Sequence, residues 1–139
     1  MKKFLLSIIA LCAVSLMASA QFQVTVKLTG TCVFPDQDTY YAVWVGVENT
    51  VTHQIVETQV SVTPTTNYSY PPIIQIQLDA FCTADNTKLY KTQVEAAKIY
   101  QTTPPTVICS NKITTTETFS CEDFLNNIDL TLSNPITLQ

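Results

Sequence analysis

The stretch QFQVTVKLT, residues 21–29, alternates polar and apolar side chains without interruption. One set of alternate positions holds Phe22, Val24, Val26 and Leu28. Because successive side chains of a strand point to opposite faces, this set covers one face of an extended segment and leaves a polar face behind it. The stretch therefore predicts a β-strand that rests on a core by one face only.

The same period of two predicts a hairpin over residues 40–62. YYAVWVGVE, residues 40–48, has one Tyr/Val face, and HQIVETQVSV, residues 53–62, places its valines together. Asn49-Thr50 supplies a turn between the two strands. The second face of the first strand carries Tyr40, Ala42 and Trp44, so we expect that strand to be central and buried on both faces.

Residues 87–100 fit two structures. At a period of 3.6 residues, Tyr90, Val94 and Ala97 share a helix face, whereas at a period of two Tyr90, Val94 and Ala96 share a strand face. The strand-rich surroundings favour a strand, and a short helix stays open as the alternative.

Further strands are expected over residues 73–81, 107–109, 113–119 and 128–132, with a turn at Asn111-Lys112. SCEDFLNN, residues 120–127, predicts one helical turn, because Ser120 and Asp123 have capping spacing. Pro135 predicts that the last residues form an edge strand or a tail.

Seven to eight short strands separated by turn residues indicate an all-β fold, an antiparallel β-sandwich with room for one short helix. The strand count resembles that of an immunoglobulin-like domain. The Cys…Trp…Cys spacing of true immunoglobulin domains is not reproduced, so no family is assigned.

Residues 1–20, MKKFLLSIIALCAVSLMASA, have the pattern of a secretory signal peptide: two lysines, an apolar run and a small-x-small site. The run is short for a membrane span, and Leu11 before Cys12 does not fit a lipoprotein anchor. We therefore expect cleavage after Ala20 and one secreted domain over residues 21–139. We expect no transmembrane segment after cleavage and a secreted, periplasmic or cell-surface location.

Composition argues against several classes of protein. Without the leader, the chain has five lysines, no arginine and eleven acidic residues, a net charge of −6. Such a chain is a poor partner for nucleic acid, because it offers few cations to neutralise phosphates. Gly30 and Gly46 are its only glycines, so a glycine-rich phosphate loop cannot form, and no cofactor is expected.

Four cysteines remain after the leader: Cys32, Cys82, Cys109 and Cys121. An even number in a small exported domain predicts two disulfides. Zinc sites use short C-x-x-C or C-x-x-H pairs, which this sequence lacks, and no metal is expected. Three connectivities remain open, and the preferred one pairs Cys32 with Cys82 and Cys109 with Cys121.

NYSYPP, residues 67–72, contains the candidate binding loop, Tyr68, Tyr70, Pro71 and Pro72. Tyrosines are amphipathic anchors, and two prolines restrict the segment to few conformations, which lowers the entropy lost on binding. The alternative is that both rings only cover the end of the sandwich. VFPDQD, residues 33–38, is expected to add contacts.

Catalytic and calcium-binding interpretations have weaker support. His53 is the only histidine, and no motif joins it to a nucleophile, so we interpret it as a solvated turn residue. Asp36 and Asp38 supply two carboxylates, whereas calcium takes six to eight oxygens. Glu48 and Glu57 could mimic a glycosidase pair, but nothing in the sequence fixes their separation.

These features predict a secreted or cell-envelope, non-enzymatic binding or structural module whose partner is an unknown protein or glycan. Two alternatives remain open: a small secreted enzyme inhibitor, and a calcium-dependent carbohydrate-binding domain. The second alternative requires that Asp79 or Asp85 converge on the aspartates of VFPDQD.

Overall fold

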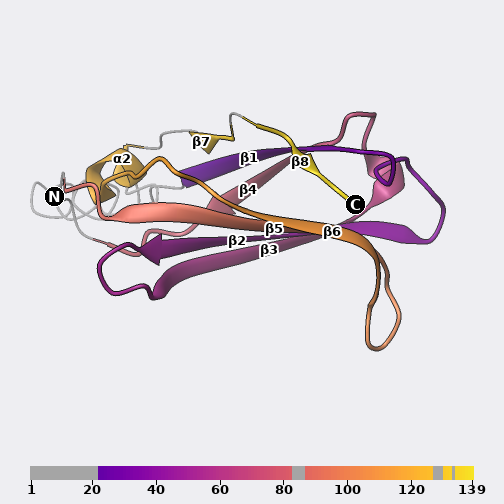
Figure 1. The fold of residues 1–139 in the computed structure, drawn as a ribbon, viewed down its shortest axis with the longest axis horizontal. Helices are drawn as coiled ribbons and strands as arrows, with labels where there is room; N and C mark the ends of the chain where they lie inside the picture. The colour runs from indigo at the N-terminus through magenta and orange to yellow at the C-terminus, as the bar shows by residue number, and fades with distance from the viewer. Residues whose placement is uncertain (1–21, 83–86, 127–129, 133) are drawn as a thin grey trace, which may run out of the picture.

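The computed structural model of the protein describes residues 22–82, 87–126, 130–132 and 134–139. Two β-sheets lie face to face and enclose a hydrophobic core (Figure 1). The expected all-β sandwich is therefore confirmed.

The first sheet is built around β1 (Phe22–Thr29), the strand that the opening stretch predicts. β1 pairs antiparallel with β4 (Ile73–Leu78) and parallel with two short strands, β7 (Leu130–Thr131) and β8 (Ile136–Thr137). The sandwich is thus antiparallel except for these two pairings. They are parallel because the chain reaches them from the end of the sandwich at which β1 also begins (Figure 1).

The last residues form an edge strand and not a tail. Pro135 precedes β8 and therefore interrupts no ladder. The Leu138 N–H donates to the Thr29 carbonyl (2.9 Å). Ile136 and Leu138 are each 1% exposed, so the C-terminal residues help to close the core.

The second sheet has the order β3-β2-β5-β6 and is antiparallel throughout. Its strands are β2 (Thr39–Asn49), β3 (Ile55–Pro64), β5 (Tyr90–Tyr100) and β6 (Thr106–Thr114). The β2–β3 hairpin, the central position of β2 and the strand over residues 90–100 are confirmed. The expectation that β2 is buried on both faces is wrong, because the first sheet covers only its inner face and Tyr40 and Trp44 stay half-exposed.

β6 is one continuous strand, so the expected turn at Asn111-Lys112 is wrong. Asn111 lies opposite Ala96 of β5, and Lys112 lies opposite Glu95. The side-chain amide of Asn111 also donates to the Thr137 carbonyl (2.8 Å). These long-range bonds keep extended a dipeptide whose local preference is for turns.

The short helix α2 (Cys121–Leu125) covers the end of the sandwich at which β1 begins. Its capping box is formed as the sequence predicts: the Asp123 N–H donates to Ser120 Oγ (3.1 Å), and the Asp123 carboxylate accepts from the Ser120 N–H (2.9 Å). These hydrogen bonds lower the pKa of Asp123. Phe124 is fully buried and stacks on Phe22, with ring centroids 4.7 Å apart.

Two disulfides join Cys32 to Cys109 and Cys82 to Cys121. The two bonds are confirmed, but the preferred pairing of Cys32 with Cys82 is wrong. The sandwich brings the loop after β1 beside β6, whereas Cys82, at the exit of β4, reaches α2 at the opposite end. One bridge therefore fastens β6 to the β1–β2 loop, and the other fastens the exit of β4 to the helix.

Candidate binding site at the loop end

Three connections meet at one end of the sandwich, which we call the loop end: residues 30–38, 65–72 and 101–105 (Figure 1). Strand register places them together, because Thr39 at the start of β2 lies opposite Tyr100 at the end of β5. The next residue of β2 lies opposite the last residue of β3. The two segments that the sequence singled out, VFPDQD and NYSYPP, thus become neighbours.

An exposed pair of aromatic rings lies where these two segments touch. Phe34 and Tyr70 stack with ring centroids 5.1 Å apart and ring planes inclined by 13°. Phe34 is 55% exposed and Tyr70 is 52% exposed. Large apolar side chains held in contact at a surface are typical of sites that bind other molecules.

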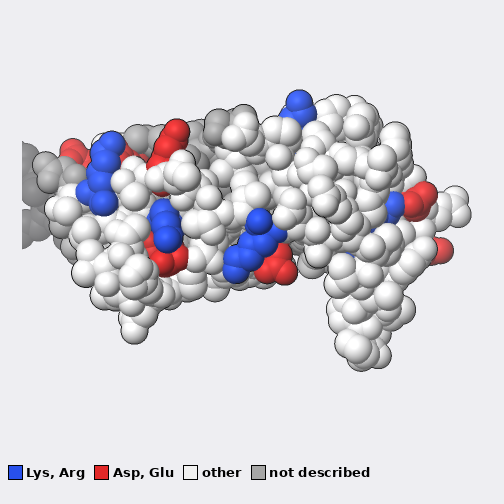
Figure 2. Space-filling model, in the orientation of Figure 1, with Lys and Arg blue, Asp and Glu red and all other residues white. Residues whose placement is uncertain are grey.

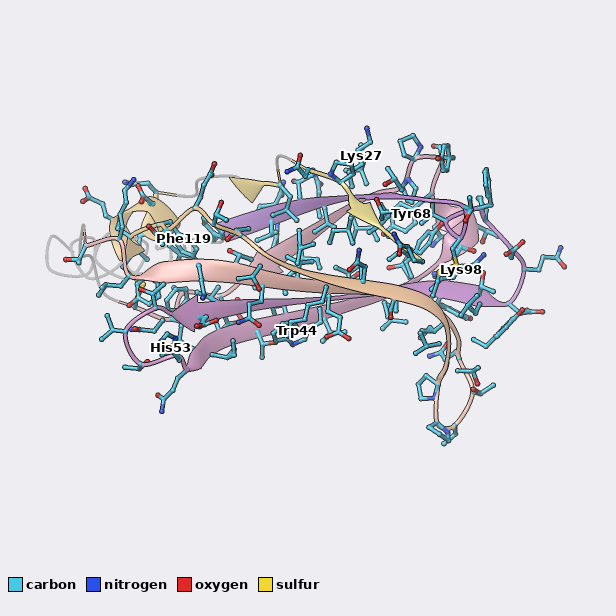
Figure 3. The ribbon with its side chains drawn as sticks, in the orientation of Figure 1. Lys27, Trp44, His53, Tyr68, Lys98 and Phe119 are labelled. Carbon is cyan, nitrogen blue, oxygen red and sulfur yellow. A yellow bond between two sulfur atoms is a disulfide. The ribbon has the colours of Figure 1, made fainter. Side chains whose placement is uncertain are left out.

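The other members of the candidate binding loop lie deeper. Tyr68 is half-buried, and its ring centroid is 5.9 Å from that of the buried Tyr41 (Figure 3). Pro71 is half-buried and Pro72 is buried. In NYSYPP, Tyr70 is therefore the ring available for contact, whereas Tyr68 and Pro72 anchor the segment to the core.

Buried threonines hold the two segments together. Thr65, the first residue of η1 (Thr65–Asn67), is fully buried, and Thr39 is 2% exposed. Thr65 Oγ1 accepts from the Asp36 N–H (3.1 Å) and lies 2.9 Å from Thr39 Oγ1. The Thr39 hydroxyl donates to the Asp36 carbonyl (2.9 Å). Because these groups are satisfied inside the protein, the segments are fixed before any partner arrives.

A buried lysine completes the support of the β1–β2 loop. Lys98 of β5 is 4% exposed, and its Nζ donates to the Phe34 carbonyl (2.9 Å) and to the Asp36 carboxylate (Figure 3). The Asp36 side chain is 61% exposed, so the ion pair spans the boundary between core and solvent. Burial and, second, the negative charge of Asp36 raise the pKa of the neighbouring Tyr41.

A pocket of about 400 Å³ opens beside this ion pair. Its lining is mainly polar and consists of Asp36, Gln37, Asp38, Thr39, Tyr40, Pro64 and Thr66. Asp38 has a φ of 61°, a left-handed conformation that aspartate tolerates better than most residues. The lining side chains offer several hydrogen-bond acceptors next to an aromatic ring, an arrangement suited to a polar ligand with hydroxyl or amide donors.

The geometry gives the calcium alternative no added support. The Asp36 carboxylate is engaged by Lys98. Within the described ranges, no three residues among His, Cys, Asp and Glu converge. Asp85, one of the two further candidates, lies outside the described residues. Two carboxylates, one of them already paired, are far from the coordination that calcium takes.

His53 lies at the opposite end of the sandwich (Figure 3), where it forms a separate polar cluster with Glu48. His53 Nδ1 is 3.1 Å from Glu48 Oε1, and the His53 side chain is 74% exposed. Lys91 Nζ is 3.3 Å from the same carboxylate oxygen, and Gln93 donates to the other. The hydrogen bond from His53, followed by those from Gln93 and Lys91, lowers the pKa of Glu48. The cluster therefore stabilises an ionised carboxylate beside the hairpin turn.

Glu48 and Glu57 do not form a glycosidase pair. Glu57 lies opposite Val47, whose side chain points into the core. Glu48 follows Val47 and bonds to Gln93, which lies opposite Gly46 on the outer face. The two carboxylates therefore belong to opposite faces of the sheet, and they cannot flank one glycosidic bond.

The β5–β6 loop was missed as part of the site, because Pro104-Pro105 marked only a break in the chain. The loop extends away from both sheets (Figure 1), and its tip stands clear of the molecular surface (Figure 2). The Thr102 N–H donates to the Tyr100 carbonyl (2.9 Å), and the Thr102 hydroxyl donates to the Pro104 carbonyl (2.7 Å). These local bonds give the projecting loop a defined shape.

Comparisons of the chain with models of protein families, with curated proteins and with solved structures found no match. Among the described residues, no helix has the length and apolar character needed to cross a membrane. The two disulfides are compatible with an extracellular protein.

Proposed function

We propose that this protein is an exported, non-enzymatic binding module that contacts its partner through the loop end. The observation that carries the proposal is the exposed stack of Phe34 on Tyr70, at the same end of the sandwich as a polar pocket. Aromatic side chains provide large contact areas at low entropic cost, and these two are already fixed by the buried threonines and by Lys98.

Export is supported by the leader-like residues 1–20 and by the two disulfides, because such bonds persist in oxidising compartments. The non-enzymatic part of the proposal rests on the sequence, which joins its only histidine to no nucleophile motif. The partner class is a glycan or a protein surface. The pocket favours a glycan as the first probe, because sugar hydroxyls can donate to its carboxylate and amide oxygens while a sugar ring packs on an aromatic face.

The test is a binding screen of the mature protein, residues 21–139, on an array of immobilised oligosaccharides and on immobilised surface proteins from the source cells. For any probe that the wild type retains, we expect the double variant Phe34→Ala/Tyr70→Ala to bind about 10- to 30-fold more weakly, the loss typical of truncated aromatic anchors. Val51→Ala is the matched control, because Val51 is 69% exposed in the turn between β2 and β3, at the opposite end. Undiminished binding by the double variant would contradict the proposal.

A second candidate, an enzyme inhibitor, is favoured by the projecting β5–β6 loop. A preformed loop that stands clear of its domain can enter an enzyme cleft with little loss of entropy. The measurement is residual activity of a panel of secreted proteases and glycosidases with the mature protein in excess. Inhibition that is lost in Thr102→Ala supports this candidate, and full activity of every enzyme in the panel removes it.

A further inference from the structure

β3 has its apolar and polar faces reversed relative to the rest of the sandwich. Its polar residues Glu57, Gln59 and Ser61 lie opposite the core-facing valines of β2. Its valines point the other way, out of the sandwich. Val56, Val60 and Val62 are 39%, 61% and 46% exposed. An exposed apolar stripe on an ordered strand is typical of an interaction surface.

β3 is also an open edge. In the part of the chain that the structure describes, this ten-residue strand pairs only with β2. Edge strands that stay unpaired usually carry lysines, internal prolines or bulges that block a further strand. β3 has no lysine, its one proline is its last residue, and Glu57 is its only charged residue. Its register with β2 shifts once, at Val56 near its start, whereas the stretch from Glu57 to Pro64 is regular.

The other edge of the same sheet is partly occupied. The Ser110 N–H of β6 donates to the Gln139 carbonyl (3.2 Å), and the Asn111 amide donates to the Thr137 carbonyl (2.8 Å). Because the C-terminal residues lie against the middle of β6, that edge is not free along its whole length for β3 of the next molecule. Head-to-tail growth through this sheet is therefore disfavoured, and a closed pair of identical β3 edges is favoured.

The sequence of β3 is complementary to itself in the antiparallel direction. A two-fold axis at Gln59 puts Val60 opposite Thr58 of the second copy, within the regular part of the strand. In this register Glu57 faces Ser61, so the only charge of the strand meets no like charge. β-branched residues opposite one another stabilise antiparallel pairs.

We propose that two copies of this chain pair through β3, antiparallel and in the register centred on Gln59, which joins their second sheets into one continuous sheet. One strand pair buries less than the ~800 Å² per partner of a standard stable interface, so the dimer is weak and depends on concentration. The antiparallel arrangement points the two loop ends in opposite directions. With this geometry the dimer can hold two partner molecules at once, which rests on the binding function proposed for the loop end. The pairing of β3 with β3 does not depend on that function.

The test is sedimentation of the mature protein over a dilution series from micromolar to millimolar. We expect a reversible monomer–dimer equilibrium, and Val60→Lys should weaken it at least tenfold without altering the circular-dichroism spectrum, because Val60 is exposed. Val51→Lys, the same substitution at an exposed site outside the strand, should leave it unchanged. A wild type that stays monomeric throughout, or a dimer that survives Val60→Lys, overturns the proposal.

A second variant tests the register. In Thr58→Lys/Val60→Glu, each new lysine faces a new glutamate of the other copy if the axis is at Gln59, so the dimer should persist and weaken with salt. If the sheets instead pack by their outer faces, or if Val60 faces Val60, the new charges oppose association. Loss of the dimer in this variant therefore refutes the proposed pairing.

Discussion

Replacement of Asp36 by Asn tests how the loop end is held in place. The change keeps the size of the side chain and removes the negative charge that faces Lys98. Because Lys98 is 4% exposed, its ammonium group would keep the Phe34 carbonyl as a partner but lose its counter-charge. An unpaired buried charge is costly, whereas the new amide side chain costs little by itself at a site that is largely open to solvent.

The magnitude follows from the burial of the two partners. Removal of one partner from a fully buried ion pair costs about 3–5 kcal/mol. The Asp36 side chain is 61% exposed, so water screens the pair and can solvate the lysine once the charge is gone. We therefore expect Asp36→Asn to lower the free energy of unfolding by about 1–3 kcal/mol, which corresponds to a fall in Tm of roughly 4–12 °C.

The assay is urea unfolding of the oxidised protein, residues 21–139, in a double-mutant cycle with Lys98→Met. In the Lys98→Met background, Asp36→Asn should cost less than about 0.5 kcal/mol, because no buried cation is left unpaired. Asp38→Asn is the matched control in the same loop and should also change stability by less than about 0.5 kcal/mol. Equal costs of Asp36→Asn with and without the lysine would refute the reasoning.

The remaining predictions concern the disulfides, the outer face and the turn cluster. Replacement of both cysteines of a bridge by alanine should lower the free energy of unfolding by about 4.5 kcal/mol for Cys32–Cys109 and by about 4 kcal/mol for Cys82–Cys121 in the chain-entropy model. The difference arises because the bridges span 77 and 39 residues. Urea unfolding of the two variants should rank them in that order. A Cβ at Gly46 would lie 2.3 Å from the ring of Trp44, so Gly46→Ala should displace the ring. Because Trp44 is the only tryptophan, its fluorescence emission should then shift to the red. An unchanged spectrum would show that the ring does not rest on Gly46. Since the folded pKa of Glu48 is lowered from 4.5, its stabilising contribution is complete above that pH and is lost as the pH falls through the lowered value. The free energy of unfolding of Glu48→Gln should therefore depend less on pH between about 3 and 5 than that of the wild type. Identical pH profiles would contradict the stabilising role given to the Glu48 carboxylate.

The strands could be predicted because their signal is local. Alternation in QFQVTVKLT and YYAVWVGVE follows from burial of one face, and each strand shows it without reference to its neighbours. The turn predicted at Asn111-Lys112 was wrong because the structure there is not decided locally. The dipeptide favours a turn by itself, but its extended form depends on β5 and on the C-terminal residues. The disulfide pairing likewise depends on which connections lie at which end of the sandwich.

The site was only half visible in the sequence. VFPDQD and NYSYPP were identified singly, but their contact through Phe34 and Tyr70 depends on the register of β2 with β3 and β5. Lys98 was missed, although a signal was present, since it continues the inward-facing positions of Thr92, Val94 and Ala96 on β5. A lysine in such a series predicts a buried cation that needs a partner.

The central claim is that an exported, oxidised sandwich presents its fixed loops at one end, and mass analysis of the protein from its native source tests it most directly. Intact mass should correspond to residues 21–139 less four hydrogens, and digestion without reduction should yield peptides that join Cys32 to Cys109 and Cys82 to Cys121. Retention of residues 1–20, free thiols, or a bond between Cys32 and Cys82 would contradict the account.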